Sequence, residues 1–169
     1  MATQELKSAG VTNLDATPSV KNNVQNNGAR LRRYFATDEV GVGDVGSTYR
    51  MIRVRASDII HRLEYASDDE NASVTMNVGL YDVNDDAVED ADFFASALAT
   101  GAGAKARTDI TSESAVVPIE DQGKALWEQL SLTDTPANRE KLFDIYGTSA
   151  GAATTGSSLS MWVELARQE

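Results

Sequence analysis

The sequence contains no cysteine and only one histidine among its 169 residues. Without cysteine the chain forms neither a disulfide nor a thiolate metal site, and its redox compartment stays open. With His61 alone, a histidine-rich zinc site and a Cys–His catalytic dyad are excluded. A Ser–His–Asp triad would have to use His61, but no serine lies in a G-x-S-x-G turn. We therefore expect His61 to be a core or interface residue.

Long apolar runs are also missing. No run approaches the roughly 20 residues that a membrane-spanning helix needs. The first ten residues, MATQELKSAG, lack the apolar segment of a secretory signal. We therefore expect a protein that is made inside the cell and has no membrane partner.

Lysine and arginine are absent from residues 63–104, which hold ten acidic residues. Residues 1–62 carry a net charge of +3 and residues 105–169 a net charge of −4, so most of the total of −11 lies in the middle of the chain. Binding to nucleic acid phosphates needs clustered positive charge, so nucleic acid is not an expected partner. The acidic surface either serves solubility or leaves a basic N-terminal part to dock on something acidic.

The first 29 residues differ in composition from the rest. They are rich in Asn, Thr, Ser and Gln and show no sustained periodicity. Residues 1–29 are therefore interpreted as an extended N-terminal arm, ordered against a partner or the fold, or as a disordered tail. Residues 30–169 are expected to form one body.

Alternation of apolar and polar residues, typical of strands with one buried face, recurs along this body. It is clearest over 73–81, where Val74, Met76, Val78 and Leu80 share one face. Three further strands are expected. Over 29–36, Leu31, Arg33 and Phe35 lie opposite Arg32 and Tyr34, and over 48–56, Ile52 and Val54 lie opposite Met51, Arg53 and Arg55. Over 59–65, Ile59, His61, Leu63 and Tyr65 lie on one side. Residues 143–148 and 159–165 are expected to form a closing hairpin.

Helical spacing occurs twice. Ala91, Phe94, Ala95 and Leu98 predict a short amphipathic helix over 87–100, and Leu126, Trp127 and Leu130 predict another near 122–130. Residues 101–115 are expected to be a flexible or extended loop. Six or seven short strands with two short helices indicate a mainly β fold, an antiparallel β-sandwich or barrel.

The acidic segment after residue 81 matches the ligand pattern of a calcium-binding loop only in part. Asp82, Asn84 and Asp86 match the first three ligand positions of a calcium loop, but Ala87 and Phe93 occupy the later glycine and glutamate positions. Aspartate caps of a turn explain the same residues. A looser calcium site, formed by Asp85, Asp86, Glu89 and Asp90, is the remaining alternative. We assign no metal and no cofactor.

Other catalytic signatures also fail. With 26 acidic residues, a carboxylate pair at glycosidase spacing is expected by chance, and Gly41, Gly43 and Gly46 are not followed by the Gly-Lys-Ser/Thr of a P-loop. We therefore expect no enzyme and assign no catalytic residue.

Aromatic and basic side chains on the predicted outward faces indicate contact surfaces instead. Tyr34, Tyr81 and Trp162 fall on such faces, and outward aromatics on strands often mark interfaces. A second sheet or the arm is the alternative cover for them. The arginines Arg50, Arg53 and Arg55, with Arg62, are expected to pair with the acidic 82–92 segment of a neighbouring copy or within one chain.

Several segments resemble small head-associated proteins of tailed bacteriophages, of the decoration or cement type. They are GLYDV (79–83), VEDADFFASAL (88–98), GKALWEQLSL (123–132) and SLSMWVELA (158–166), with TNLDATPSV (12–20) and STYRMIRVRASDIIHRLEYA (47–66) upstream. The connection DTPANREK (134–141) departs from the family's pattern. The resemblance implies a β-sandwich or jelly-roll-like body, made in the host cytoplasm and assembled as a homo-oligomer, usually a trimer, on the capsid surface of the virion. Its implied partner is the major capsid protein.

Two other classes of function stay open. A phage tail or receptor-binding β module would share the β architecture and would be expected to bind cell-surface glycan. The chain offers only Trp127 and Trp162 for such a site. A small hydrolase is the enzyme alternative.

Overall fold

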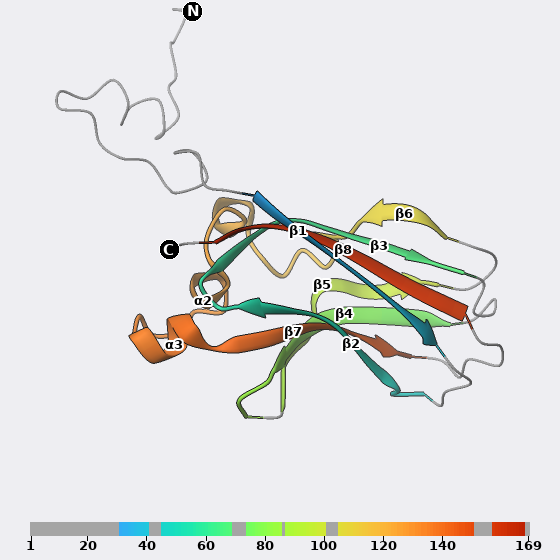
Figure 1. Cartoon of the computed structure of the whole chain (residues 1–169), viewed down its shortest axis with the longest axis horizontal. Coiled ribbons are helices and arrows are strands. Elements are labelled where there is room, and N and C mark those ends of the chain that lie inside the picture. The colour runs from blue at the N-terminus through green and yellow to red at the C-terminus, as the bar shows by residue number, and fades with distance from the viewer. Residues whose placement is uncertain are drawn as a thin grey trace, which may run out of the picture.

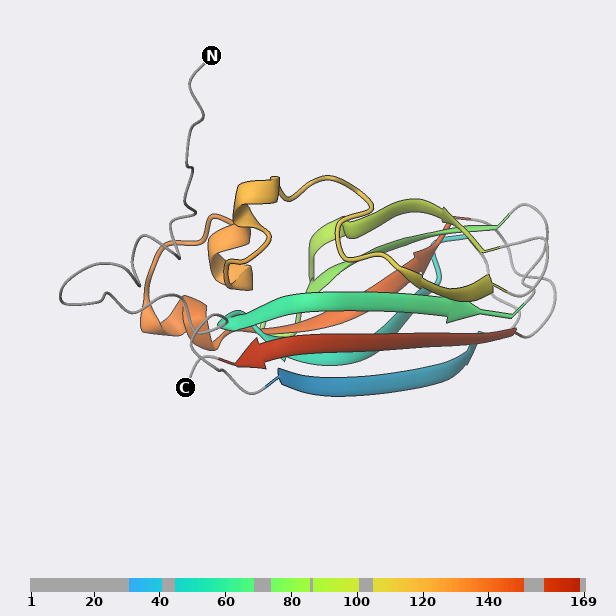
Figure 2. The same ribbon diagram turned by 90° about the horizontal axis from the view of Figure 1, so that it is seen from above.

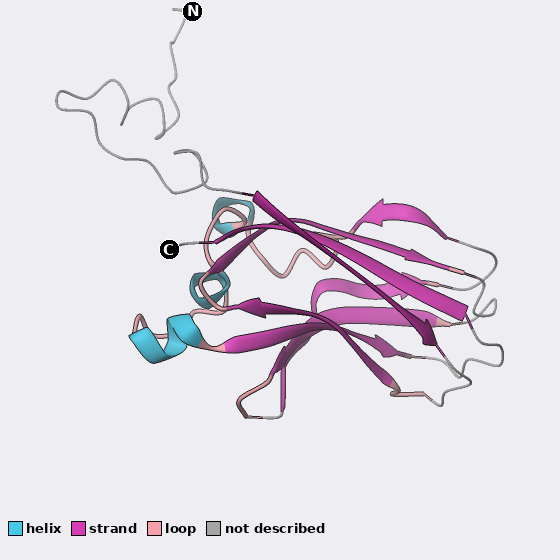
Figure 3. Cartoon of the chain, viewed as in Figure 1, coloured by secondary structure: helices cyan, strands magenta, loops and turns pink. Residues whose placement is uncertain are grey.

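The computed structural model describes residues 31–40, 45–68, 74–85, 87–100, 105–150 and 157–167. The predicted arm, residues 1–29, lies outside these residues. The described part contains eight β-strands and three short helical segments (Figures 1 and 3). The strands are β1 Leu31–Val40, β2 Thr48–Arg55, β3 Asp58–Ser67, β4 Thr75–Asp82, β5 Ala87–Ala99, β6 Lys105–Asp109, β7 Leu142–Ser149 and β8 Ser157–Arg167.

The strands form two antiparallel four-stranded sheets that face each other. Sheet A has the order β1-β8-β3-β6 and sheet B the order β2-β7-β4-β5. Successive strands alternate between the sheets except for β4 and β5, which are neighbours in sheet B, and this order is that of an eight-stranded jelly roll. The predicted mainly β sandwich with a jelly-roll-like body is therefore confirmed.

The core fills the space between the two sheets. Its largest fully buried side chains come from both sheets and from the β6–β7 connection: Tyr65, Phe94, Phe143, Leu63, Met76, Leu80, Ile110, Leu126, Ile145 and Leu159. The predicted inward face of β4 is confirmed, because Val74, Met76, Val78 and Leu80 are all at most 2% exposed. Burying each such side chain contributes about 1.5–3 kcal/mol.

Residues 87–100 form a strand, which corrects the predicted helix. β5 pairs with β4, but the register shifts between Val78 and Leu80, whose partners are Ala95 and Asp90. Such a bulge breaks the two-residue alternation and puts Phe93, Phe94 and Ala95 in the core together. A bulged strand thus imitates helical spacing in the sequence.

Two further corrections concern the chain's path. β7 and β8 do not form a hairpin, because β7 lies in sheet B between β2 and β4 and β8 lies in sheet A between β1 and β3. The segment expected to be a loop contains β6, which pairs with β3. Alternation marks a strand and its buried face, but does not say which sheet the strand joins.

Five side chains face the opposite way from the prediction. Tyr34 of β1 packs against the core, whereas Phe35 and Leu31 are more than half exposed. His61 is exposed rather than in the core, because a bulge between Ile60 and Arg62 turns it away from Leu63. Met51 packs against the core at a similar bulge in β2.

The β6–β7 connection crosses one end of the sandwich, as the perpendicular view in Figure 2 shows. It carries the 3-10 turn η2 Ile119–Asp121, the helix α2 Leu126–Gln129 and the helix α3 Pro136–Glu140. The predicted helix near 122–130 is confirmed as α2. Ala125 and Trp127 cover Ile59 and Ala166 of sheet A, and the Trp127 amide donates to the Ala56 carbonyl.

Candidate contact surface

An aromatic pair lies on the outer face of sheet A, the face turned away from the core. Phe35 of β1 is directly opposite Trp162 of β8, and their ring centroids are 5.0 Å apart. The guanidinium of Arg107, from β6, lies 4.7 Å from the Trp162 ring centroid. Trp162 is therefore half-buried under its neighbours, while Phe35 remains 56% exposed. Phe35 therefore exposes a larger fraction of its side chain on this face than Trp162 does.

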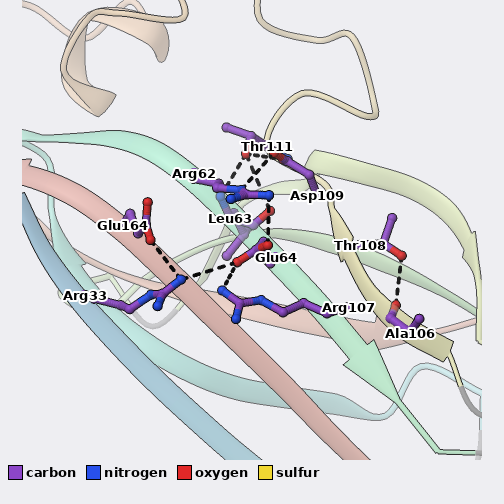
Figure 4. Close-up of polar contacts among 10 residues, drawn as sticks. All are labelled: Arg33, Arg62, Leu63, Glu64, Ala106, Arg107, Thr108, Asp109, Thr111 and Glu164. Atoms are coloured by element: carbon purple, nitrogen blue, oxygen red, sulfur yellow. Dashed lines mark hydrogen bonds and ion pairs between the residues drawn. The ribbon is translucent and has the colours of Figure 1, made fainter.

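A charge network surrounds Glu64 next to this pair (Figure 4). The Glu64 carboxylate is 7% exposed and binds Arg107 and Arg62, the latter at 3.0 Å. Arg33 of β1 lies 3.9 Å from Glu64 and pairs with Glu164 at 2.9 Å. The network joins all four strands of sheet A, so it fixes the side chains of this face in one arrangement.

Asp109 ends β6 at the margin of the same network. Its carboxylate accepts hydrogen bonds from the Thr111 hydroxyl and amide and from Arg62 at 3.2 Å. Burial alone would raise the pKa of Asp109, but the Thr111 hydrogen bonds and the Arg62 charge lower it overall. The carboxylate therefore stays ionised and holds the end of β6 against β3.

Asp144 organises the outer face of sheet B. This carboxylate, 8% exposed, accepts hydrogen bonds from Arg53 at 2.7 and 3.0 Å and from Arg50 at 2.8 Å. Burial by itself raises the pKa of Asp144, but the hydrogen bonds and charges of Arg53 and Arg50 lower it overall. Two of the predicted interface arginines thus share one acid within the chain.

The predicted Tyr81 adjoins this cluster. Arg50 lies over the Tyr81 ring at 4.2 Å, and Tyr81 contacts buried Tyr146 edge to face with ring centroids 6.0 Å apart. Burial, together with the charges of Asp90 and Asp92, raises the pKa of Tyr146, and a contact with the Thr148 hydroxyl opposes the rise. Tyr81 points outward as predicted, but it is half-buried in this cluster.

The acidic turn after β4 is held by a partly buried ion pair. Lys141 lies 2.7 Å from Asp82, which also accepts hydrogen bonds from the amides of Asn84 and Asp85. Burial raises the pKa of Asp82, but Lys141 and the two amides lower it overall. This is the aspartate-capped turn expected from the sequence. Asp86 lies outside the described residues, among which no group of three potential metal ligands was found.

The predicted interface residues therefore divide among several places. Arg50, Arg53 and Tyr81 lie together on sheet B, while Arg55, at the end of β2, is 3.5 Å from Glu140 of α3. Trp162 lies on sheet A and Tyr34 faces the core, which corrects its predicted outward position. Phe35 was not predicted as a surface residue, because the sequence pattern assigned the inward and outward faces of β1 the wrong way round.

A recess at the end of the sandwich is lined by Ile60, Phe94, Thr111, Ser112, Val117, Gln122 and Gln129. Its cavity volume is about 10 Å³, which is about what one water molecule needs, so the recess is too small for a small-molecule ligand. None of its lining residues is ionisable. The described helices include none long and apolar enough to cross a membrane.

Comparisons with known proteins add little to these observations. No protein-family model matches the sequence, and no curated protein does. The chain is similar to a solved structure described as "Cyanophage Pam1 capsid asymmetric unit", with a TM-score of 0.49 and 17% identity, over 83% of this chain and 87% of that chain. A likeness at this level carries no argument about function, so function is argued below from the residues of this chain.

Proposed function

We propose that this chain is a virion structural protein of a tailed bacteriophage, a decoration or cement protein that binds the outside of the head. The observation that carries the proposal is the outer face of sheet A. There Phe35, 56% exposed, packs against half-buried Trp162 beside the Glu64 ion pairs, and Leu31, 60% exposed, lies beyond Arg33 on the same strand face. An exposed apolar patch rimmed by polar residues is typical of a protein–protein contact.

The sequence resemblance supports the proposal, and the structure gives its segments roles in the fold. DADFFASA forms the bulged part of β5 and places Phe93 and Phe94 in the core. GKALWEQL contains α2 and covers Ile59, and SLSMWVELA forms β8 in the interior of sheet A. These three segments therefore supply core and covering residues of the jelly roll.

Shell stabilisation by such a protein is a matter of geometry and needs no reaction. One oligomer that contacts several subunits of the major capsid protein must be detached before those subunits separate. Linked contacts also raise the total affinity well above that of each one alone. Following the resemblance, we propose a trimer on local three-fold positions of the capsid surface.

Binding to heads that lack decoration tests this proposal. The purified chain should co-sediment with expanded, undecorated heads, saturate at a fixed number of copies per head, and raise the temperature at which the heads rupture. Heads that already carry their full decoration serve as the control and should bind no more. Failure to co-sediment with undecorated heads would overturn the proposal.

Cryo-microscopy of the virion distinguishes a decoration protein from the alternative, a phage tail or receptor-binding module. Density for the jelly roll over the capsid lattice supports decoration. Density at the tail instead would show a tail or receptor-binding module.

A further inference from the structure

β1 is the least protected edge strand among the described strands. Four strands lie at sheet edges, namely β1 and β6 in sheet A and β2 and β5 in sheet B. Edge strands present unpaired amides and carbonyls, so proteins shorten, bulge or charge them to prevent pairing with other chains. β6 has five residues, β5 has several register shifts, and β2 has a bulge and outward arginines.

β1 is neither short nor bulged, and its four charged residues lie near its ends, so residues 34–37 at its centre are uncharged. Its ten residues pair with β8 without a shift from Leu31 to Val40, and the strand contains neither proline nor lysine. Figure 2 shows β1 at the margin of sheet A, with no described strand beyond it. Leu31 and Phe35 lie on its outer face and are more than half exposed. A long, regular, partly apolar edge favours the addition of a further strand.

The charge pattern of β1 matches the strand to itself in the antiparallel direction. Arg32 and Arg33 lie near its start, and Asp38 and Glu39 lie near its end. An antiparallel pair of two such strands sets the basic end of each against the acidic end of the other. A parallel pair would set like charges side by side, which is unfavourable.

We propose that two copies of this chain associate through antiparallel pairing of their β1 strands, which joins the two A sheets into one eight-stranded sheet. Phe35 faces Phe35 of the partner subunit at the two-fold axis. Arg32 of each copy then faces Asp38 of the other, because opposite residues in this register have numbers that add to 70. The aromatic row of Phe35 and Trp162 continues across the junction.

This pair is distinct from the trimer proposed above and stands without it. Its two-fold symmetry cannot generate a three-fold contact, so it joins two single chains or two trimers. The test therefore uses the purified chain in solution, and its result does not depend on binding to heads.

Cysteine cross-linking tests the register. The chain has no native cysteine, so Phe35→Cys provides a unique thiol. Directly opposite residues of an antiparallel pair have Cβ atoms about 4.5–5.5 Å apart, close to the distance that a disulfide spans. Mild oxidation should give a covalent dimer of the Phe35→Cys chain. The matched control is Ile119→Cys on η2, where the native residue is 85% exposed. A Phe35→Cys chain that does not cross-link, or a control that cross-links equally well, would contradict the proposal.

A charge exchange tests the pairing direction. Arg32→Asp and Asp38→Arg should each weaken association roughly tenfold in sedimentation equilibrium, because each creates two repulsive pairs. The double variant Arg32→Asp/Asp38→Arg should restore it. A monomeric wild-type chain, or association that neither single variant weakens, would overturn the proposal. Circular dichroism confirms that each variant is folded.

Discussion

Single residues hold this sandwich together mainly where a buried acid meets arginine or lysine. Asp58 is fully buried and binds Arg167 of β8 at 2.8 and 2.9 Å, while Asp144 binds Arg50 and Arg53 on the opposite sheet. A buried carboxylate is costly unless it is paired, so each pair depends on both of its partners. The sequence pointed to the arginines but not to Asp144, because an acid inside a strand gives no sign of which neighbour it will meet.

Asp144→Asn should lower the free energy of unfolding by about 2 kcal/mol at pH 7, since it removes the charge shared by two partly exposed arginines. Urea unfolding measures the change. Asp134→Asn is the control, because the ion pair of Asp134 with Arg139 is exposed and screened by solvent, so the free energy of unfolding should change much less.

The interaction of Asp144 with Arg50 and Arg53 also predicts that stability depends on pH. The pKa of Asp144 is lower in the folded protein than in the unfolded chain, so its stabilisation is fully present above the unfolded value. It is lost as the pH falls through the folded value. The difference in stability between wild type and Asp144→Asn should therefore shrink below about pH 4. A difference that stays constant down to pH 2 would contradict the assigned ion pair.

At the scale of elements, register irregularities decide what the sequence could predict. β4 has regular alternation, and its buried face was predicted correctly. β5 and the start of β3 carry bulges, and there the predicted helix and the predicted strand face of His61 were wrong. A bulge is set by how a strand pairs with its neighbour in the sheet, so the pattern of residues within the strand itself does not reveal it.

Gly79 lets the bulge of β5 pass close to β4. A Cβ at this position would overlap the Asp90 carbonyl and lie 2.5 Å from the Ala91 carbonyl carbon. Gly79→Ala should therefore lower the free energy of unfolding by about 2–3 kcal/mol, because backbone has to move. Thr75→Ala, on the same strand face, is the control with an expected change near zero. An unchanged unfolding midpoint for Gly79→Ala would argue against the bulge.

Ser131, just after α2, has a backbone conformation that glycine would adopt at lower cost. Ser131 has a φ of 55°, and the Leu132 amide donates to the Trp127 carbonyl while the Ser131 amide donates to that of Glu128. This is a Schellman ending, which favours glycine at the left-handed position. Ser131→Gly should raise the free energy of unfolding by about 1 kcal/mol, and Ser131→Val should lower it. Thermal melts of both variants test this, and a loss of stability with glycine would contradict the assigned ending.

At the scale of the whole molecule, the alternation of short strands and turns predicted a sandwich, but it did not predict the order of its strands. That order depends on which sheet each strand joins, as the wrong β7–β8 hairpin illustrates. The contact surface was predicted only in part, because the outward position of Trp162 was found while the one-residue error in β1 hid Phe35. Contact residues on a sheet depend on which face each strand turns to the core. β1 has an arginine and an aromatic residue on each face (Arg33 and Phe35, Arg32 and Tyr34), so its pattern does not identify the buried face.

Removal of residues 1–28 tests whether these residues are needed for folding or for binding to the phage head. The core is closed within the described residues, with β1 paired to β8 along its full length, so the truncated chain should keep its thermal midpoint within a few degrees. Its binding to undecorated heads should weaken by roughly tenfold or more, because the loss of one of several linked contacts lowers the total affinity steeply. The β1 contact should persist, so Phe35→Cys in the truncated chain should still cross-link. Unfolding of the truncated chain would instead show that the N-terminal residues belong to the core, and unchanged head binding would remove them from the contact surface.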